Sequence, residues 1–168
     1  CGETSLEEKR AVEVGNIFKL GTKFSKAVAF KVRDKDGKED DVLMCSYGIG
    51  PSRIMGTVVE IYHDEKGMIW PKNLAPFSVH LISLKQNEVT EKIYQDLISR
   101  NIEVLYDDRD DIAPGEKFAD ADLIGCPYRL VVSSKTLEQN KIEFKARDND
   151  KIELIDVDKI LDFIKNSD

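Results

Sequence analysis

The sequence of 168 residues contains few cysteines and no long apolar run. No stretch approaches the roughly 20 consecutive apolar residues that a membrane-spanning helix needs, so we expect no membrane association. The first ten residues lack an apolar centre, and we therefore expect no signal peptide there. The three cysteines, Cys1, Cys45 and Cys126, are too few and too widely spaced for a disulfide framework or a complete zinc site. This cysteine usage favours a reducing, cytoplasmic location.

An excess of basic residues is also missing, because the net charge is -7. Residues 1–75 carry 12 Lys and Arg against 12 Asp and Glu, whereas residues 76–168 carry 13 against 20, which accounts for the whole charge. A general nucleic-acid binder is expected to be basic. The composition therefore argues against non-specific binding to nucleic acid. If the second half binds RNA, it must use a local patch and specific base contacts.

The apolar fraction of 41% and the charged fraction of 34% are typical of a globular protein. Residues 70–76 contain Pro71 and Pro76, two of the five prolines. Because prolines stiffen a linker and interrupt regular structure, we place a domain boundary here. The expected domains are residues 1–75 and residues 76–168. No internal repeat or low-complexity segment is apparent.

Apolar periodicity after this boundary predicts an α/β domain. Expected strands cover residues 77–84, 102–106, 128–133, 141–147 and 151–155. Expected helices cover residues 88–100, with Asn87 as N-cap, residues 115–124, and a last segment that Asp156 caps. Alternating strands and helices predict parallel strands, and the closing hairpin makes the sheet mixed. The prediction is a five-stranded mixed sheet with three helices.

Residues 46–53, Ser-Tyr-Gly-Ile-Gly-Pro-Ser-Arg, follow a strand-like run and precede an apolar-periodic segment. We expect a strand, a glycine turn and a helix. Gly48 and Gly50 would allow a ligand to approach the backbone, Pro51 suits a first helical turn, and Arg53 would face an anion near the helix N-terminus. An ordinary tight turn before a core helix, with a solvated arginine, explains the same pattern. The pattern alone leaves both interpretations open.

Three segments together resemble bacterial-type prolyl-tRNA synthetase, a class II aminoacyl-tRNA synthetase. They are residues 13–25 (Glu-Val-Gly-Asn-Ile-Phe-Lys-Leu-Gly-Thr-Lys-Phe-Ser), residues 46–53, and residues 63–71 (His-Asp-Glu-Lys-Gly-Met-Ile-Trp-Pro). Residues 48–53 look like motif 3 of this class. Residues 77–168 look like the anticodon-binding domain that the prolyl, threonyl, histidyl and glycyl enzymes share.

This resemblance implies the end of an antiparallel-sheet catalytic domain followed by an anticodon-binding domain. Motifs 1 and 2 and the editing domain of the family would lie upstream, so we expect a C-terminal fragment that is inactive alone. The missing initiating Met also suggests a cut or processed piece. Cys1 and Gly2 look like the second half of a Cys-x-x-Cys pair found in many relatives.

The resemblance also implies which residues bind ATP and proline. Arg53 matches the motif 3 arginine, which packs against adenine and reaches the γ-phosphate, and it is the expected catalytic residue. The ATP-binding residues implied by the family are Glu13, Asn16, Gly48, Gly50 and Arg53. Phe18 and Ser46 fall on the proline pocket, although an ordinary core aromatic explains Phe18 equally well. Relatives often carry His at position 16 and Cys at position 46.

The parent enzyme would use ATP with Mg²⁺, bind proline and the anticodon of tRNA(Pro), and form a homodimer. No protein-bound metal is expected in this chain. His63 and His80 have no partner at metal-binding spacing, and we expect both to be structural.

A second candidate site is the segment of residues 107–118, Asp-Asp-Arg-Asp-Asp-Ile-Ala-Pro-Gly-Glu-Lys-Phe, here called the acidic loop. It follows an expected strand and opens a helix, which is the edge where open α/β sheets bind ligands. Proline anticodons contain two guanines. Carboxylates of Asp107, Asp108 and Glu116 would accept from guanine donors, and Arg109 and Lys117 would donate to its acceptors. A solvated acidic loop is the alternative.

A different class of function also remains open, namely a free-standing RNA-binding accessory module of the anticodon-binding type without catalysis. A reading frame that continues upstream into motifs 1 and 2 would favour the enzyme. A start codon just before Cys1 would favour the module.

Overall fold

The computed structural model describes residue 2 and residues 5–166. The chain divides into two compact units, residues 1–57 and residues 58–168. Cys1, part of the expected cysteine pair, lies outside the described residues. The predicted boundary between residues 75 and 76 stays a prediction.

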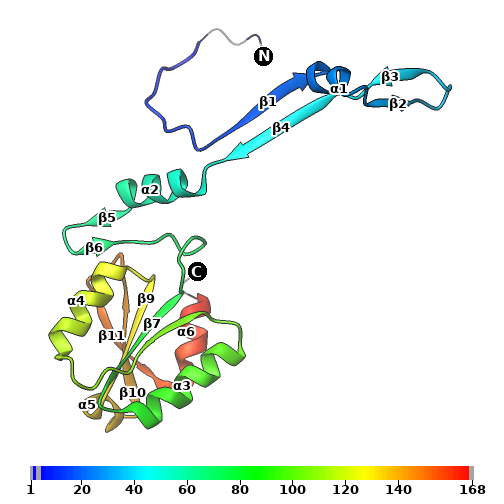
Figure 1. The fold of residues 1–168 in the computed structure, drawn as a ribbon. Helices are drawn as coiled ribbons and strands as arrows, with labels where there is room; N and C mark the ends of the chain where they lie inside the picture. The colour runs from blue at the N-terminus through cyan, green and yellow to red at the C-terminus, as the bar shows by residue number, and fades with distance from the viewer. Residues whose placement is uncertain (1, 3–4, 167–168) are drawn as a thin grey trace. The chain divides into compact units, whose positions relative to one another are not determined.

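The N-terminal unit is built on an antiparallel ribbon of β1 (Gly15–Gly21) and β4 (Met44–Ile49) (Figure 1). Its other elements are α1 (Lys23–Ala27), β2 (Lys31–Arg33) and β3 (Glu39–Asp41). Strands β2 and β3 pair antiparallel and form a short hairpin. Asp34 shapes its turn, because its Oδ1 accepts hydrogen bonds of 2.9 Å from the amides of Asp36 and Lys38.

The glycine segment differs from the prediction, because strand β4 continues through Gly48 instead of ending in a turn. Only Gly50 separates β4 from helix α2 (Pro51–Ile61). The physical reason is the pairing with β1, which extends the hydrogen-bonded ladder past the expected turn. A Cβ added at Gly48 would lie 2.8 Å from Oδ1 of Asn16, so glycine permits this close pairing. Pro51 opens the helix, as predicted.

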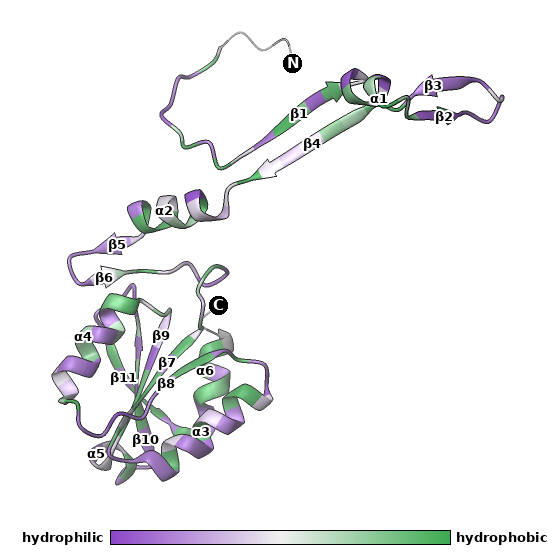
Figure 2. Cartoon of the chain, viewed as in Figure 1, coloured by the Kyte–Doolittle hydropathy of each residue, from purple (hydrophilic) through white to green (hydrophobic). Residues whose placement is uncertain are grey.

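Most of the apolar side chains of the N-terminal unit are exposed. Among its described residues only Ser25 is buried. The exposed large apolar side chains include Val14, Ile17, Phe18, Phe24, Phe30, Leu43, Tyr47 and Ile49. Two of them, Ile17 and Phe18, lie on strand β1, which Figure 2 shows with green segments. An apolar surface of this kind is typical of an interaction site.

The C-terminal unit contains the five-stranded mixed sheet that the sequence predicted, in the order β11-β10-β9-β7-β8. The strands are β7 (Val79–Leu84), β8 (Val104–Asp107), β9 (Tyr128–Ser133), β10 (Lys141–Ala146) and β11 (Ile152–Asp156). Strand β7 pairs in parallel with β8 and β9, and β10 pairs antiparallel with β9 and β11. The carboxyl ends of the three parallel strands therefore meet at one edge.

The three expected helices are present, with two additions. They are α3 (Asn87–Ser99), α4 (Pro114–Ile124) and α6 (Ile160–Asn166), and the additions are α5 (Ser134–Leu137) and the 3₁₀ helix η1 (Val157–Lys159). Asn87 is the first helical residue and not the N-cap, a position that Gln86 occupies. Asp156 precedes η1, and its side chain makes no capping hydrogen bond. The short helix α5 begins at a reciprocal cap between Ser133 and Thr136.

The two faces of this sheet carry cores of very different size. The larger core joins strand residues such as Leu81 and Leu130 to Leu97 of α3 and Ile160 of α6. The smaller core contains only Ile82, Ala121 and Val131 as buried members, with Leu84 and Phe118 packed against them. Helix α4 lies on this second face and contributes little apolar surface to it.

A hairpin of β5 (His63–Asp64) and β6 (Gly67–Met68) follows α2. It belongs to the C-terminal unit. Among the described residues, no helix is long and apolar enough to cross a membrane. The same residues contain no cluster of three or more His, Cys, Asp or Glu that could hold a metal ion. Cys45 and Cys126 are free thiols.

Candidate functional site

Four residues predicted to bind ATP or proline lie on one face of the β1–β4 ribbon. Asn16 is paired with Gly48, and Phe18 is paired with Ser46. Because side chains alternate along a strand, residues 16 and 18 share a face, and their partners share it with them. We call these four residues the ribbon face. Phe18 remains half exposed, so it is not an ordinary core aromatic in this unit.

Three further predicted residues lie at the end of the ribbon. Nη1 of Arg53 donates to the carbonyl oxygen of Glu13, and Nδ2 of Asn16 donates to Oε1 of Glu13 at 2.6 Å. The amide of Gly50 donates to the carbonyl oxygen of Val14 at 2.9 Å. These bonds join the irregular segment before β1 to the start of α2. The side chain of Arg53 is exposed, so its guanidinium is accessible to an anion.

The acidic loop is organised by a buried carboxylate, Asp107, at the end of β8. Nε and Nη2 of Arg109 donate to its two oxygens at 2.9 and 2.8 Å, and Nη2 also donates to Oδ2 of Asp120 at 2.8 Å. Burial acts to raise the pKa of Asp107, but the hydrogen bonds from Arg109 and the nearby Lys117 outweigh it and lower that pKa to about 2. Asp107 is therefore ionised at neutral pH.

Lys117 faces the sheet and is almost completely buried. Its Nζ donates to the carbonyl oxygen of Ser83 at 2.8 Å and lies 3.3 Å from Oδ1 of Asp107. Asp108 and Glu116, the other two residues predicted to meet guanine, are exposed. The structure thus brings Asp107, Arg109 and Lys117 together and leaves the two other carboxylates at the surface. Whether each of the five contacts RNA stays a prediction.

A cavity of about 190 Å³ opens beside these residues, at the carboxyl ends of β7 and β8. Its lining includes Ser83, Lys85, Arg109, Pro114 and Lys117. Because ligand pockets commonly measure about 300–1,000 Å³, this cavity suits one part of a larger ligand, such as a single base. A neighbouring depression of about 510 Å³ extends the same edge over the start of α3.

The residues that follow β7 were missed in the sequence. Lys85, Gln86 and Asn87 line the depression, and Nδ2 of Asn87 donates to Oδ2 of Asp110 at 3.0 Å. The sequence pattern could have indicated these residues, because the loops that follow two neighbouring parallel strands, β7 and β8, lie at the same edge of the sheet. The sequence interpretation considered only the loop after β8.

The two histidines lie in different surroundings. His80 is buried in β7, and burial lowers its pKa. Nδ1 of His63 lies 3.0 Å from the carbonyl oxygen of Val59. The structural role expected for both stays a prediction.

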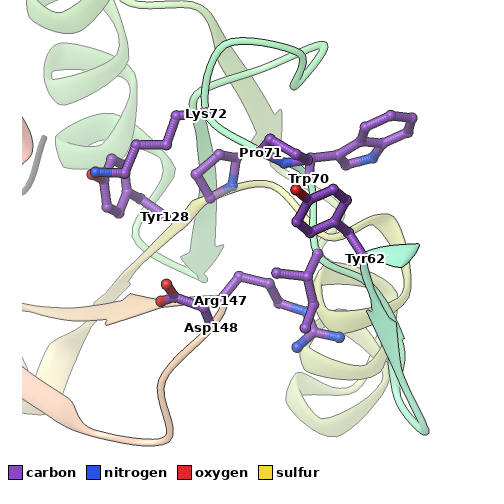
Figure 3. A pocket seen from close by; sticks show the side chains of 9 residues that line it. Tyr62, Trp70, Pro71, Lys72, Tyr128, Arg147 and Asp148 are labelled. Atoms are coloured by element: carbon purple, nitrogen blue, oxygen red, sulfur yellow. The ribbon is translucent and has the colours of Figure 1, made fainter. Parts of the chain in front are cut away.

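Another cavity of the C-terminal unit measures about 350 Å³ and is lined by aromatic and basic side chains (Figure 3). Tyr62, Trp70, Tyr128 and Arg147 line it, and Nζ of Lys72 lies 5.3 Å from the centre of the Tyr128 ring. None of the residues predicted to bind ATP, proline or RNA lines this cavity.

The mixed sheet, with a polar edge at the carboxyl ends of its parallel strands, defines the class of protein. The chain belongs to the anticodon-binding domain family, whose model matches residues 75–167.

Comparison with curated proteins then extends the similarity through the N-terminal unit. The chain is 48% identical to the proline–tRNA ligase of Persephonella marina over 164 residues, which is 95% of this chain and 29% of that protein. It is 44% identical to the proline–tRNA ligase of Thermodesulfovibrio yellowstonii over 180 residues, covering 99% of this chain and 31% of that protein. The proline–tRNA ligase of Aquifex aeolicus is 42% identical over 170 residues, covering 98% of this chain and 29% of that protein.

The chain therefore spans about three tenths of the length of these relatives. The resemblance to prolyl-tRNA synthetase noted in the sequence is confirmed.

Proposed function

We propose that this chain is part of a proline–tRNA ligase, in which the C-terminal unit recognises the tRNA anticodon and the N-terminal unit supplies part of the catalytic site. The observation that carries the proposal is the identity of 42–48% with proline–tRNA ligases over at least 95% of the chain in the three comparisons given above. This similarity includes residues upstream of the anticodon-binding family match, which begins at residue 75. The expected cytoplasmic location is part of the proposal.

The exposed apolar surface of the N-terminal unit supports this assignment. A ribbon that leaves Ile17, Tyr47 and Ile49 in solvent suits the edge of a larger sheet that more of the catalytic domain completes. The accessible Arg53 at its end suits a group that meets ATP phosphates. A planar, permanently charged guanidinium can both stack on adenine and stabilise the charge that develops when proline attacks.

On this proposal, Glu13, Asn16, Gly48 and Gly50 form the adenine side of the ATP site with Arg53. Phe18 and Ser46, on the ribbon face, form the proline side, where an apolar wall and a small polar group suit a pyrrolidine ring. Mg²⁺ would accompany the ATP phosphates. Motif 1 of the intact enzyme would supply the homodimer contact.

The acidic loop would read the guanines of the anticodon. A splayed guanine presents N–H donors on one edge and O6 and N7 acceptors on another. Asp108 and Glu116 are exposed acceptors, and Arg109 is a donor already oriented by two carboxylates. Paired charges of both signs explain how a unit with a net negative charge could bind a specific RNA without a general basic patch.

The competing function is an RNA-binding accessory module without catalysis. The matched length upstream of residue 75 favours the ligase, because a pure anticodon-binding module has no use for the segment that resembles motif 3.

The ligase is tested with the longer protein that contains this chain. We expect proline-dependent exchange of pyrophosphate into ATP, and charging of tRNA(Pro), but no comparable exchange with threonine or alanine. Exchange that no amino acid stimulates, in a protein that still binds tRNA(Pro), would favour the accessory module.

A further inference from the structure

The β5–β6 hairpin is closed by one carboxylate, Asp64. Its Oδ1 accepts hydrogen bonds from the amides of Lys66 at 2.8 Å and Gly67 at 3.0 Å. These bonds shape the two-residue turn in the manner of an Asx turn. The side chain of Asp64 therefore determines the form of the hairpin and remains available to a second partner.

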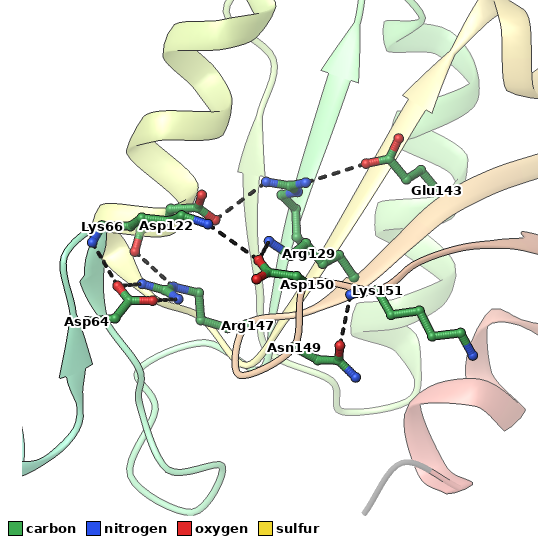
Figure 4. A network of polar contacts seen from close by, with 10 residues as sticks. Asp64, Lys66, Asp122, Arg129, Glu143, Arg147, Asn149, Asp150 and Lys151 are labelled. Atoms are coloured by element: carbon green, nitrogen blue, oxygen red, sulfur yellow. Dashed lines mark hydrogen bonds and ion pairs between the residues drawn. The ribbon is translucent and has the colours of Figure 1, made fainter.

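That partner is Arg147, at the end of β10 (Figure 4). Its Nη1 and Nη2 donate to the two oxygens of Asp64 at 2.8 and 2.7 Å, and its Nε donates to the carbonyl oxygen of Asp122 in α4 at 3.0 Å. Hydrogen bonds from Arg147 hold the pKa of Asp64 well below its usual range. We call this pair the clasp. It joins the hairpin, the sheet and α4, and the side chain of Arg147 is only 5% exposed.

The backbones of the hairpin and α4 also interlock. Gly125 ends α4 in a left-handed conformation, with φ of 77°, and a Cβ there would collide with the carbonyl group of Met68. A Cβ at Gly67 would collide with the backbone of Leu123. The indole Nε1 of Trp70 donates to the carbonyl oxygen of Ile124 at 3.1 Å. The hairpin is therefore seated directly on the carboxyl end of α4.

Helix α4 is held at both ends by polar bonds, and few of its residues are buried. Only Lys117 and Ala121 of its 11 residues are buried. At the amino end Lys117 bonds Ser83 and Asp107, and at the carboxyl end the clasp and Trp70 bond the last carbonyls. A helix of this length is a rod of about 16 Å, so a tilt at one end displaces the other.

We propose that Asp64 and Arg147 are positioning residues for RNA recognition, which seat α4 from the hairpin side and so place the acidic loop at its other end. The proposal rests on the proposed function, because it requires the acidic loop to contact the anticodon. It assigns a role to a segment that precedes the family match. Loss of the clasp should lower selectivity for guanine while the sheet stays folded.

The variant Asp64→Asn tests this proposal in the 168-residue chain. Asn keeps an oxygen for the turn but loses the charge that Arg147 binds. Trp70 is the only tryptophan of the sequence, so its emission reports on the seat of the hairpin. We expect the emission to shift to the red. We also expect the preference for an anticodon-arm RNA with two guanines, over the same RNA with adenines, to fall about two- to thirtyfold.

The control is Asp96→Asn, which removes a surface ion pair between Asp96 in α3 and Arg100 at the C-cap of that helix, and it should change neither readout. Unchanged Trp70 emission in Asp64→Asn would overturn the proposal, and so would a shifted emission with undiminished guanine preference. If Asp64→Asn does not fold, the variant Arg147→Lys tests the proposal by the same two measurements, Trp70 emission and guanine preference. Lysine keeps the charge but cannot bond Asp64 at two points and Asp122 together.

If the proposed function is wrong, the RNA-binding experiment gives a different result from the one expected when only the role of the clasp is wrong. If the unmodified chain shows no guanine preference, RNA reading itself is wrong. Amide hydrogen exchange then decides whether the clasp seats α4. Exchange about tenfold faster at Lys117 and Phe118 in Asp64→Asn would support the seating, and unchanged exchange would overturn it.

Discussion

Asp107 is a buried carboxylate with two cationic partners, and it illustrates how single residues organise the acidic loop. Its side chain is 4% exposed and lies within 3.3 Å of both Arg109 and Lys117. A charge in such a place is stabilised only by its partners, and its removal leaves the buried Lys117 without a counter-charge.

We predict that Asp107→Asn lowers the free energy of unfolding of the chain by about 3 kcal/mol, because Lys117 is then buried without its counter-charge. Urea denaturation measures the change. Asp108→Asn, at the exposed neighbour, is the control and should stay within about 0.5 kcal/mol of the unmodified chain. Equal stability of the two variants would mean that Asp107 does not hold the loop.

The lowered pKa of Asp107 also predicts a pH dependence. The pKa is about 2 in the folded chain and about 3.9 in an unfolded one, so the unfolded state binds the proton more readily. The stability that Asp107 contributes is fully present above about pH 4 and is lost as the pH falls towards about 2. The difference in unfolding free energy between the unmodified chain and Asp107→Asn should shrink over that interval. A difference that stays constant down to pH 2 would contradict the assignment.

Arg53 provides the catalytic prediction at this scale. In the longer protein, Arg53→Ala should reduce proline-dependent pyrophosphate exchange about 100-fold or more, because a preorganised cation at the ATP phosphates is lost. Arg33→Ala removes an exposed guanidinium that binds Glu39 in the β2–β3 hairpin, and it should leave exchange unchanged. Normal exchange in Arg53→Ala would remove this residue from the catalytic site.

Among the elements, α4 carries two glycines in opposite situations. Gly125 ends the helix with a positive φ and no room for a Cβ, whereas Gly115 lies in the first turn with open space around it. We predict that Gly125→Ala destabilises the chain by about 2 kcal/mol or more, through backbone strain and displacement of Met68.

Gly115→Ala should be neutral or stabilising by up to about 1 kcal/mol, since alanine favours a helix. Thermal unfolding followed by circular dichroism compares the two variants. Similar unfolding temperatures would mean that the interlock between Gly125 and the hairpin is absent in solution.

Element prediction from the sequence succeeded where hydrophobic periodicity was long. The strands around Leu81 and Leu130 and the helix around Leu97 were predicted because buried residues recur at the period of their element. The sequence did not predict that β4 continues through Gly48, because pairing with another strand can override the turn preference of glycine. The seat of the β5–β6 hairpin depends on contacts with Gly125, about 60 residues further along the chain, and no local pattern contains them.

The candidate site was predicted only in part, for a similar reason. The acidic loop could be found, because it follows a strand and opens a helix. The burial of Lys117 could not be predicted, since a single lysine between Glu116 and Phe118 gives no sign that its side chain faces the sheet. The clasp was missed because Asp64 and Arg147 are joined only by the fold.

At the scale of the whole molecule, the two units differ in how much of an apolar core each one encloses. The C-terminal unit encloses a continuous apolar core between its sheet, α3 and α6. The N-terminal unit has Ser25 as its only buried described residue. This contrast agrees with the proposal that the N-terminal unit is one part of a larger catalytic domain.

The central claim is that the edge formed by the acidic loop and the end of β7 reads guanine bases. The most direct test is a titration of the ¹⁵N-labelled chain with an anticodon-arm RNA that carries two guanines, followed by amide chemical shifts. We predict that the largest shifts fall on residues 83–88 and 107–117 and weaken when adenines replace the guanines. Binding that shifts other residues, or that is indifferent to the bases, would contradict the account.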